Sequence, residues 1–160
     1  NPSAGAPKRI VHTGTRKLRR LFKKRKRGGR MSGMNVFEKF NTGKMRIPGG
    51  EREFDSIEWK KHPAFNGVEL KHLLTGEQTG GGFSFHLVRI APGSAIGLHI
   101  HETQLETHEV IAGQGVCLND GTEIPYEEGT VSFFPAGVPH EVRAGTEGLS
   151  LFAKFFPALC

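Results

Sequence analysis

The stretch from Gly93 to Gly113 reads GSAIGLHIHETQLETHEVIAG, and its centre holds three histidines and three glutamates between two apolar runs. Imidazole and carboxylate groups are frequent ligands of transition metals. Alternate side chains of a β-strand share one face, so His99 and His101 are expected to point to the same side. Glu106 follows after a short loop and faces the same space if it begins the next strand. The stretch therefore predicts a metal site built on short strands.

The chain around this stretch is typical of an all-β fold. Phe83–Ile90 (FSFHLVRI) is a clear strand pattern that ends at the turn Ala91–Gly93. The dipeptide Asp120–Gly121 predicts a hairpin between Val116–Leu118 and Glu123–Tyr126. Many short strands without a long helical period predict a sandwich or barrel. The remaining expectations are strands at Val68–Leu74, Gly97–His101, Glu106–Ile111, Gly115–Leu118, Thr130–Phe134, Glu141–Arg143 and Leu149–Phe156, with a loop at Thr75–Gly82.

A second segment, far along the chain, supplies another histidine. The quoted stretch has the spacing G-x5-H-x-H-x4-E-x6-G, and the segment from Gly129 to His140 has the spacing G-x5-P-x-G-x2-H. In this order the two segments resemble the two signature motifs of the cupin superfamily. The second motif departs once, because its frequent terminal Asn falls on Ala144. That position is not a metal ligand in the family.

The resemblance implies a small single-domain cupin of the cupin-2 type, which is a jelly-roll β-barrel, often dimeric, with one divalent metal inside. It implies four ligands, namely His99, His101, Glu106 and His140. Imidazole and carboxylate together suit Fe, Mn, Ni, Zn or Cu. Four protein ligands on an ion that prefers six leave two positions for water, substrate or dioxygen. The motif glycines, Gly93, Gly113, Gly129 and Gly137, stand where turns need permissive backbone angles.

Several other polar residues have two interpretations. His108 is expected to face inward beside Glu106, where it is either a proton shuttle or ligand partner, and thus catalytic, or a packed residue bonded to backbone. Arg89 and Arg143 are candidate anchors for a carboxylate substrate, although surface placement is favoured for both. Gln104, in the loop between the ligands, is a candidate to reach the mouth of the site, although a solvated loop position is favoured. The other histidines are interpreted as isolated, satisfied polar residues: His12, His62, His72 and His86.

The charge distribution divides the chain. Residues 1–30 hold twelve Lys and Arg and no acid, which leaves ten basic against sixteen acidic residues and a net charge of −6 in residues 31–160. Residues 1–30 are expected to be a disordered basic tail, serving as a nucleic-acid arm or transit peptide, or else a non-native leader. Residues 31–56 are expected to form an irregular lead-in, and residues 57–160 the barrel domain.

Three functional hypotheses follow. The first is a metal-dependent enzyme acting on a small organic molecule, with dioxygenase, isomerase or lyase chemistry. The second is a non-catalytic cupin that binds or senses a metal or small ligand, and the third, weaker one is a storage role. The barrel is expected to be homodimeric and not to bind nucleic acid itself. Two cysteines far apart are no disulfide framework, which favours the cytoplasm, and no apolar run is long enough to span a membrane.

Overall fold

The computed structural model describes residues 34–160, which form two short helices and ten strands. The basic tail therefore lies outside the described residues. In chain order the elements are α1 Val36–Asn41, β1 Lys44–Ile47, β2 Gly50–Glu53, β3 Lys60–Lys61, β4 Val68–Leu74, α2 Gly76–Thr79, β5 Ser84–Ile90, β6 Ala95–His99, β7 Leu105–Asn119, β8 Thr122–Tyr126, β9 Val131–Phe134 and β10 His140–Phe156.

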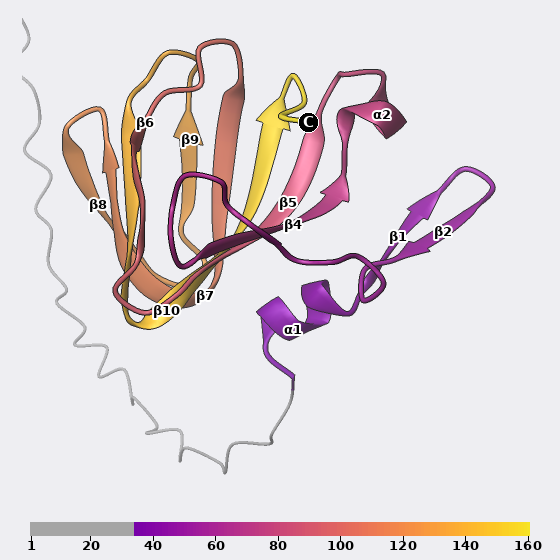
Figure 1. The fold of residues 1–160 in the computed structure, drawn as a ribbon, viewed down its shortest axis with the longest axis horizontal. Helices are drawn as coiled ribbons and strands as arrows, with labels where there is room; N and C mark the ends of the chain where they lie inside the picture. Colours follow the sequence, from indigo (N-terminus) through magenta and orange to yellow (C-terminus); the bar gives the residue numbers. More distant parts are fainter. Residues whose placement is uncertain (1–33) are drawn as a thin grey trace, which may run out of the picture. The chain divides into compact units, whose positions relative to one another are not determined.

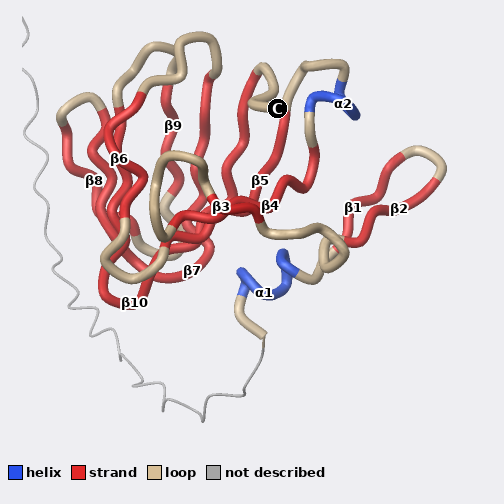
Figure 2. The backbone as a smooth tube through the Cα atoms, in the orientation of Figure 1, coloured by secondary structure: helices blue, strands red, loops and turns tan. Residues whose placement is uncertain are grey.

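Two long strands, β7 and β10, hold the barrel together. They pair with each other antiparallel along most of their length. One half of β10 pairs with β5 and the other half with β6, while β7 pairs with β9 through one half and with β8 through the other. Each long strand thus belongs to both sides of the molecule, and the sheet curls into a jelly-roll barrel (Figures 1 and 2). The all-β jelly-roll barrel predicted from the sequence is confirmed.

The long strands bend where glycines let their backbones approach closely. The pairing of β7 with β10 shifts register between Ala144 and Leu149, opposite Gly113. Gly113 has a φ of +77°, and a Cβ placed on it would lie 2.2 Å from the carbonyl oxygen of Gly148. The glycines predicted a turn that would separate two strands. The ladder instead continues through a bulge, because glycine permits both the backbone angle and the contact.

The barrel interior is the main apolar core. Inward-facing side chains of β4, β5, β7 and β10 pack with Tyr126 and Phe134 of the shorter strands. Alternation along β7 places Glu106 and His108 on the same buried face as Val110. Polar groups therefore occupy one end of an otherwise apolar interior.

The segment that precedes the barrel is ordered, which corrects the expectation of an irregular lead-in. It forms α1 and the β1–β2 hairpin, and Figure 1 shows the hairpin extending beyond the barrel sheet. Phe37 and Met45 of this segment pack against a second cluster that includes the buried Leu73 and Leu87. A sheet with apolar side chains on both faces needs a cover on its outer face. The lead-in supplies that cover.

A polar contact fastens this cover to the sheet. The Lys71 ammonium donates to both the backbone oxygen and Oδ1 of Asn41 at 2.9 Å, and the Trp59 indole N–H donates to the same Oδ1 at 3.2 Å. Lys71 is only 3% exposed, and a buried ammonium is tolerated where such acceptors meet it.

Candidate metal centre

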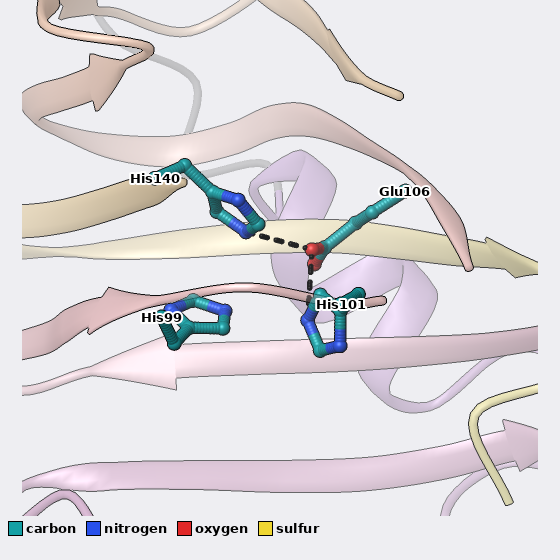
Figure 3. Close-up of side chains that lie close together, drawn as sticks. All are labelled: His99, His101, Glu106 and His140. Atoms are coloured by element: carbon teal, nitrogen blue, oxygen red, sulfur yellow. Dashed lines mark hydrogen bonds and ion pairs between the residues drawn. The ribbon is translucent and has the colours of Figure 1, made fainter. Parts of the chain in front are cut away.

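The four predicted ligands meet inside the barrel, and they come from the end of β6, the start of β7 and the start of β10. His99 ends β6 and is the register partner of His140, the first residue of β10. His101 follows β6, and its carbonyl oxygen accepts a hydrogen bond from Gly137 N–H of the second motif. Glu106 enters from β7, and Figure 3 shows its carboxylate between the rings of His101 and His140. Strand pairing thus joins His99 to His140, and the side chain of Glu106 reaches His140 from the other half of β7.

The donor atoms are close enough to share one ion. Glu106 Oε2 lies 2.9 Å from His140 Nε2 and 3.2 Å from His101 Nε2. One donor atom of each of the four residues lies within 4.8 Å of the others. Bonds of roughly 2.0–2.2 Å place neighbouring donors around an octahedral ion about 3 Å apart. The spacing and type of the donors therefore fit a single transition metal.

Two of the rings are held by backbone carbonyls. His99 Nδ1 lies 2.9 Å from the Gly97 oxygen, and His140 Nδ1 lies 3.0 Å from the Val138 oxygen. A carbonyl accepts a hydrogen bond only from a protonated nitrogen, so both rings carry a proton on Nδ1. In the neutral form of each ring, Nε2 then presents its lone pair to the site and can bind a metal.

The electrostatics of the site favour a cation. Burial alone would raise the pKa of Glu106, but His108, His101 and His140 pair with its carboxylate and lower its pKa well below the usual range. Burial would lower the pKa of His140, but the hydrogen bond to Glu106 raises it. The pKa of His99 is lowered by burial. A buried carboxylate that stays ionised attracts positive charge, which a metal ion would supply.

His108 faces inward as predicted and is nearly inaccessible, at 2% exposure. Its Nε2 lies 2.7 Å from Glu106 Oε1, and its Nδ1 lies 3.1 Å from the hydroxyl of Tyr126. Both ring nitrogens are thus engaged by side chains, not by backbone. The ring links the buried Tyr126 to the carboxylate oxygen that does not contact His101 or His140.

A small cavity opens onto these groups. Its volume is about 110 Å³, and His99, His101, Glu106 and His108 form its polar part. This is well below the 300–1,000 Å³ typical of pockets for drug-sized ligands. The rest of the lining is apolar apart from His62: Val68, Leu70, Val88, Ile96, Phe155 and Leu159.

The two candidate arginine anchors lie elsewhere. Arg89 Nε pairs with Glu69 at 2.6 Å, and its guanidinium stacks over the Trp59 ring at 4.2 Å. Arg143 pairs with Glu141 on the surface. Ile100, which strand alternation predicted to point into apolar packing, is 51% exposed because the strand ends at His99.

Two features were missed because they depend on tertiary contacts. His62 lines the cavity, and its Nδ1 accepts from the N–H groups of Ala64 and Phe65. His72 and His86, interpreted as isolated, are adjacent to each other and to Cys160. The short sequence patterns around these residues carry no signal for either arrangement.

The comparisons with known proteins concern the barrel. Residues 86–153 match the family model described as Cupin domain (Cupin_2). The oxalate-binding protein of Thermotoga maritima is 34% identical over 77 residues, which are 48% of this chain and 64% of that protein. The chain thus spans slightly less than two thirds of that relative.

Solved structures agree with this match. A predicted oxalate decarboxylase from Thermotoga maritima has a TM-score of 0.60 at 28% identity, over 64% of this chain and 95% of that one. KdgF from a Halomonas species has a TM-score of 0.56 at 17% identity, over 62% of this chain and 86% of that one, and supports the fold alone.

The remaining expectations have different outcomes. Both cysteines are free thiols, as expected from their spacing. Within residues 34–160, no helix combines the length and the apolar character that crossing a membrane requires. The homodimer and the cytoplasmic location stay predictions.

Proposed function

We propose that this chain, which carries a small cupin domain of the Cupin_2 type over residues 86–153, holds one divalent transition metal and uses it to bind a small carboxylate ligand of the oxalate class. The observation that carries the proposal is the convergence of three imidazoles and one ionised carboxylate beside a cavity of about 110 Å³, which His99, His101 and Glu106 of this set line.

His99, His101, Glu106 and His140 would hold the metal. Three nitrogen donors and one oxygen donor suit Fe, Mn, Ni, Zn or Cu, and the donor set does not choose among them. When bound, the ion would supply Lewis acidity and two coordination positions free of protein ligands. The protein fixes the site through the carbonyls of Gly97 and Val138, which orient His99 and His140.

The size and charge of the cavity support a small anionic ligand. Its volume admits only a few non-hydrogen atoms, and most of its lining is apolar. Among the described residues that line it, no Lys or Arg is present to receive a carboxylate. These conditions fit an anionic ligand whose charge is neutralised by the metal and whose two oxygens bind at adjacent coordination positions. The name of the Thermotoga relative, an oxalate-binding protein, supports the same class.

We assign His108 the role of a partner to the ligand Glu106. Its Nε2 contacts Glu106 Oε1, the carboxylate oxygen remote from His101 and His140. A proton on Nε2 fixes the orientation of the carboxylate and leaves Nδ1 to accept from Tyr126. Such partners of metal ligands commonly contribute 10- to 100-fold to metal affinity. We prefer this role to that of a free proton shuttle, because both ring nitrogens are occupied.

A second candidate function is catalysis on the bound ligand, with lyase, isomerase or dioxygenase chemistry. The predicted oxalate decarboxylase, at 28% identity, favours a lyase. Glu106 is the one carboxylate in the described cavity lining, and three histidines already engage it. His62 also lines the cavity, and its Nδ1 accepts hydrogen bonds from two backbone N–H groups.

The test begins with elemental analysis of protein purified without added metal, beside His101→Ala. About one equivalent that is lost in the variant supports the site. Titration calorimetry with oxalate should then give saturable heat for the metal-loaded protein and none for the metal-free protein or the variant. Oxalate consumption under the same conditions would favour the enzyme, and binding without consumption the binding protein. Equal metal content in both proteins after loading and desalting would refute the ligand assignment.

A further inference from the structure

A second cluster of metal-binding side chains lies away from the cupin site. His72 on β4 and His86 on β5 are register partners across the antiparallel pair. Cys160 follows β10, and Figure 1 shows this end of the chain beside β5 and α2. One donor atom from each of the three residues lies within 4.8 Å of the other two. Two imidazoles and a thiol from three separate segments therefore meet at one point.

The contacts inside this cluster aim the ring nitrogens at each other. His72 Nδ1 lies 2.8 Å from His86 Nδ1 and 3.7 Å from the Cys160 sulfur. His86 Nε2 lies 2.8 Å from Ser84 Oγ, which can accept its proton. That tautomer leaves the lone pair of His86 on Nδ1, directed at the cluster. A ligating histidine usually donates its outer N–H to an oxygen acceptor, and the hydroxyl oxygen of Ser84 is in that position here.

The same serine also fixes the segment that carries the thiol. Ser84 Oγ accepts from Leu159 N–H at 2.9 Å. The carbonyl of Cys160 accepts from Gly76 N–H, and Ala158 N–H donates to Gly81 at 3.0 Å. Cys160 is thus held against α2 and β5 by its own backbone and by its neighbours, although its side chain is accessible.

The protonation states suit ligation. Burial lowers the pKa of His86 to about 3, and burial followed by the charge of Lys60 lowers the pKa of His72. Both rings are therefore neutral at pH 7, which is the form that binds metals. Burial raises the pKa of the Cys160 thiol, while Lys60 opposes the rise. A metal ion would displace the thiol proton into solvent on binding.

One side of the cluster is open. His72 and Cys160 line a cavity of about 570 Å³, which Glu58 and Glu77 also line together with Arg52 and Lys60. The charges of the two acidic and two basic side chains cancel, so the cavity lining has no net positive charge that would repel a cation. Water or an external ligand can reach a bound ion from this side.

We propose that His72, His86 and Cys160 form a second metal site whose ion is Zn²⁺. Two imidazoles and one thiolate, with a fourth position open to solvent, are a zinc donor set, and the sulfur selects a softer ion than the cupin site does. Zinc binding here joins β4, β5 and the C-terminal segment. The inference does not depend on the function proposed for the cupin site, because the two sites share no residue.

Cobalt(II) is the probe, because a thiolate ligand gives it a sulfur-to-metal charge-transfer absorption in the near ultraviolet that imidazole and carboxylate ligands do not give. The full chain is titrated with Co²⁺ as wild type, His101→Ala, Cys160→Ser and Cys117→Ser. Cys117→Ser is the matched control, since it removes the other thiol, which is buried in the barrel. The charge-transfer band should appear in the wild type, in His101→Ala and in Cys117→Ser, disappear in Cys160→Ser, and be abolished by excess Zn²⁺.

Ser84→Ala provides the second variant, because it keeps all three ligands. It should weaken zinc binding about 10- to 100-fold in a competition assay with a chromophoric chelator. Absence of the band from the wild type would overturn the proposal, as would its persistence in Cys160→Ser. Loss of the band in His101→Ala would assign the thiolate signal to the cupin site and overturn the proposal as well.

Discussion

Three glycines, one in the turn between β5 and β6 and two in β7, distinguish two costs of adding a side chain: an unfavourable backbone angle and a steric clash. Gly93 has a φ of +69°, and a Cβ added to it would meet no atom within 4 Å, so alanine there tests the backbone angle alone. A Cβ on Gly115 would lie 2.2 Å from the oxygen of Arg143, without a positive φ, and tests the close approach alone. Gly113 combines a φ of +77° with a 2.2 Å approach to the oxygen of Gly148.

The expected losses of unfolding free energy follow from these geometries. Gly93→Ala should cost roughly 1–2 kcal/mol for a left-handed angle. Gly115→Ala should cost roughly 1–3 kcal/mol, because the atoms in the way are backbone and the strand must shift. Gly113→Ala should cost about the sum, roughly 2–5 kcal/mol. The lower chain entropy of unfolded alanine offsets about 0.4–1 kcal/mol in all three alike.

The assay is urea unfolding followed by circular dichroism, with metal content measured on the same samples. Gly113 lies between Glu106 and the half of β7 that pairs with the His140 half of β10. We therefore expect Gly113→Ala and Gly115→Ala to lower metal occupancy, and Gly93→Ala to leave it closer to that of the wild type. Equal losses of stability in Gly93→Ala and Gly113→Ala would refute the argument that the close approach matters.

Three further predictions concern single side chains. Because His86 has a pKa of about 3 when folded and about 6.5 when unfolded, the unfolded chain binds a proton that the folded chain excludes, and stability falls as the pH drops below 6.5. Between pH 7.5 and 5 this costs about 2 kcal/mol, and His86→Gln should lack that part of the loss in urea titrations with chelator present. His108→Leu removes the partner of Glu106 and should weaken metal binding about 10- to 100-fold in chelator competition; unchanged affinity would show that the contact does not matter. Asn41→Ala removes the side-chain acceptor of the buried Lys71 and should destabilise by about 1–3 kcal/mol in urea, whereas a loss near zero would mean that the lead-in is not fastened there.

The candidate ligands were predictable because they lie in two short motifs that resemble those of a known family. Alternation places His99 and His101 on one face, and fixed spacings bring Glu106 and, through the second motif, His140 into the set. The all-β class was predictable because turn residues and alternating patterns mark strands without reference to partners. The bulge at Gly113 was mistaken for the end of a strand, because a glycine marks either one and only pairing with β10 distinguishes them.

What the sequence by itself determined, then, is the strand pattern and the spacing of the candidate ligands within each motif, both of which are set within a few residues along the chain. The tertiary structure decided which distant groups meet. The register of β4 against β5 places His72 beside His86, and the return of the C-terminal segment brings Cys160 to them. The order in residues 36–53 likewise depends on an apolar outer face that only the assembled sheet presents. Register and packing are properties of pairs of segments, so no single segment encodes them.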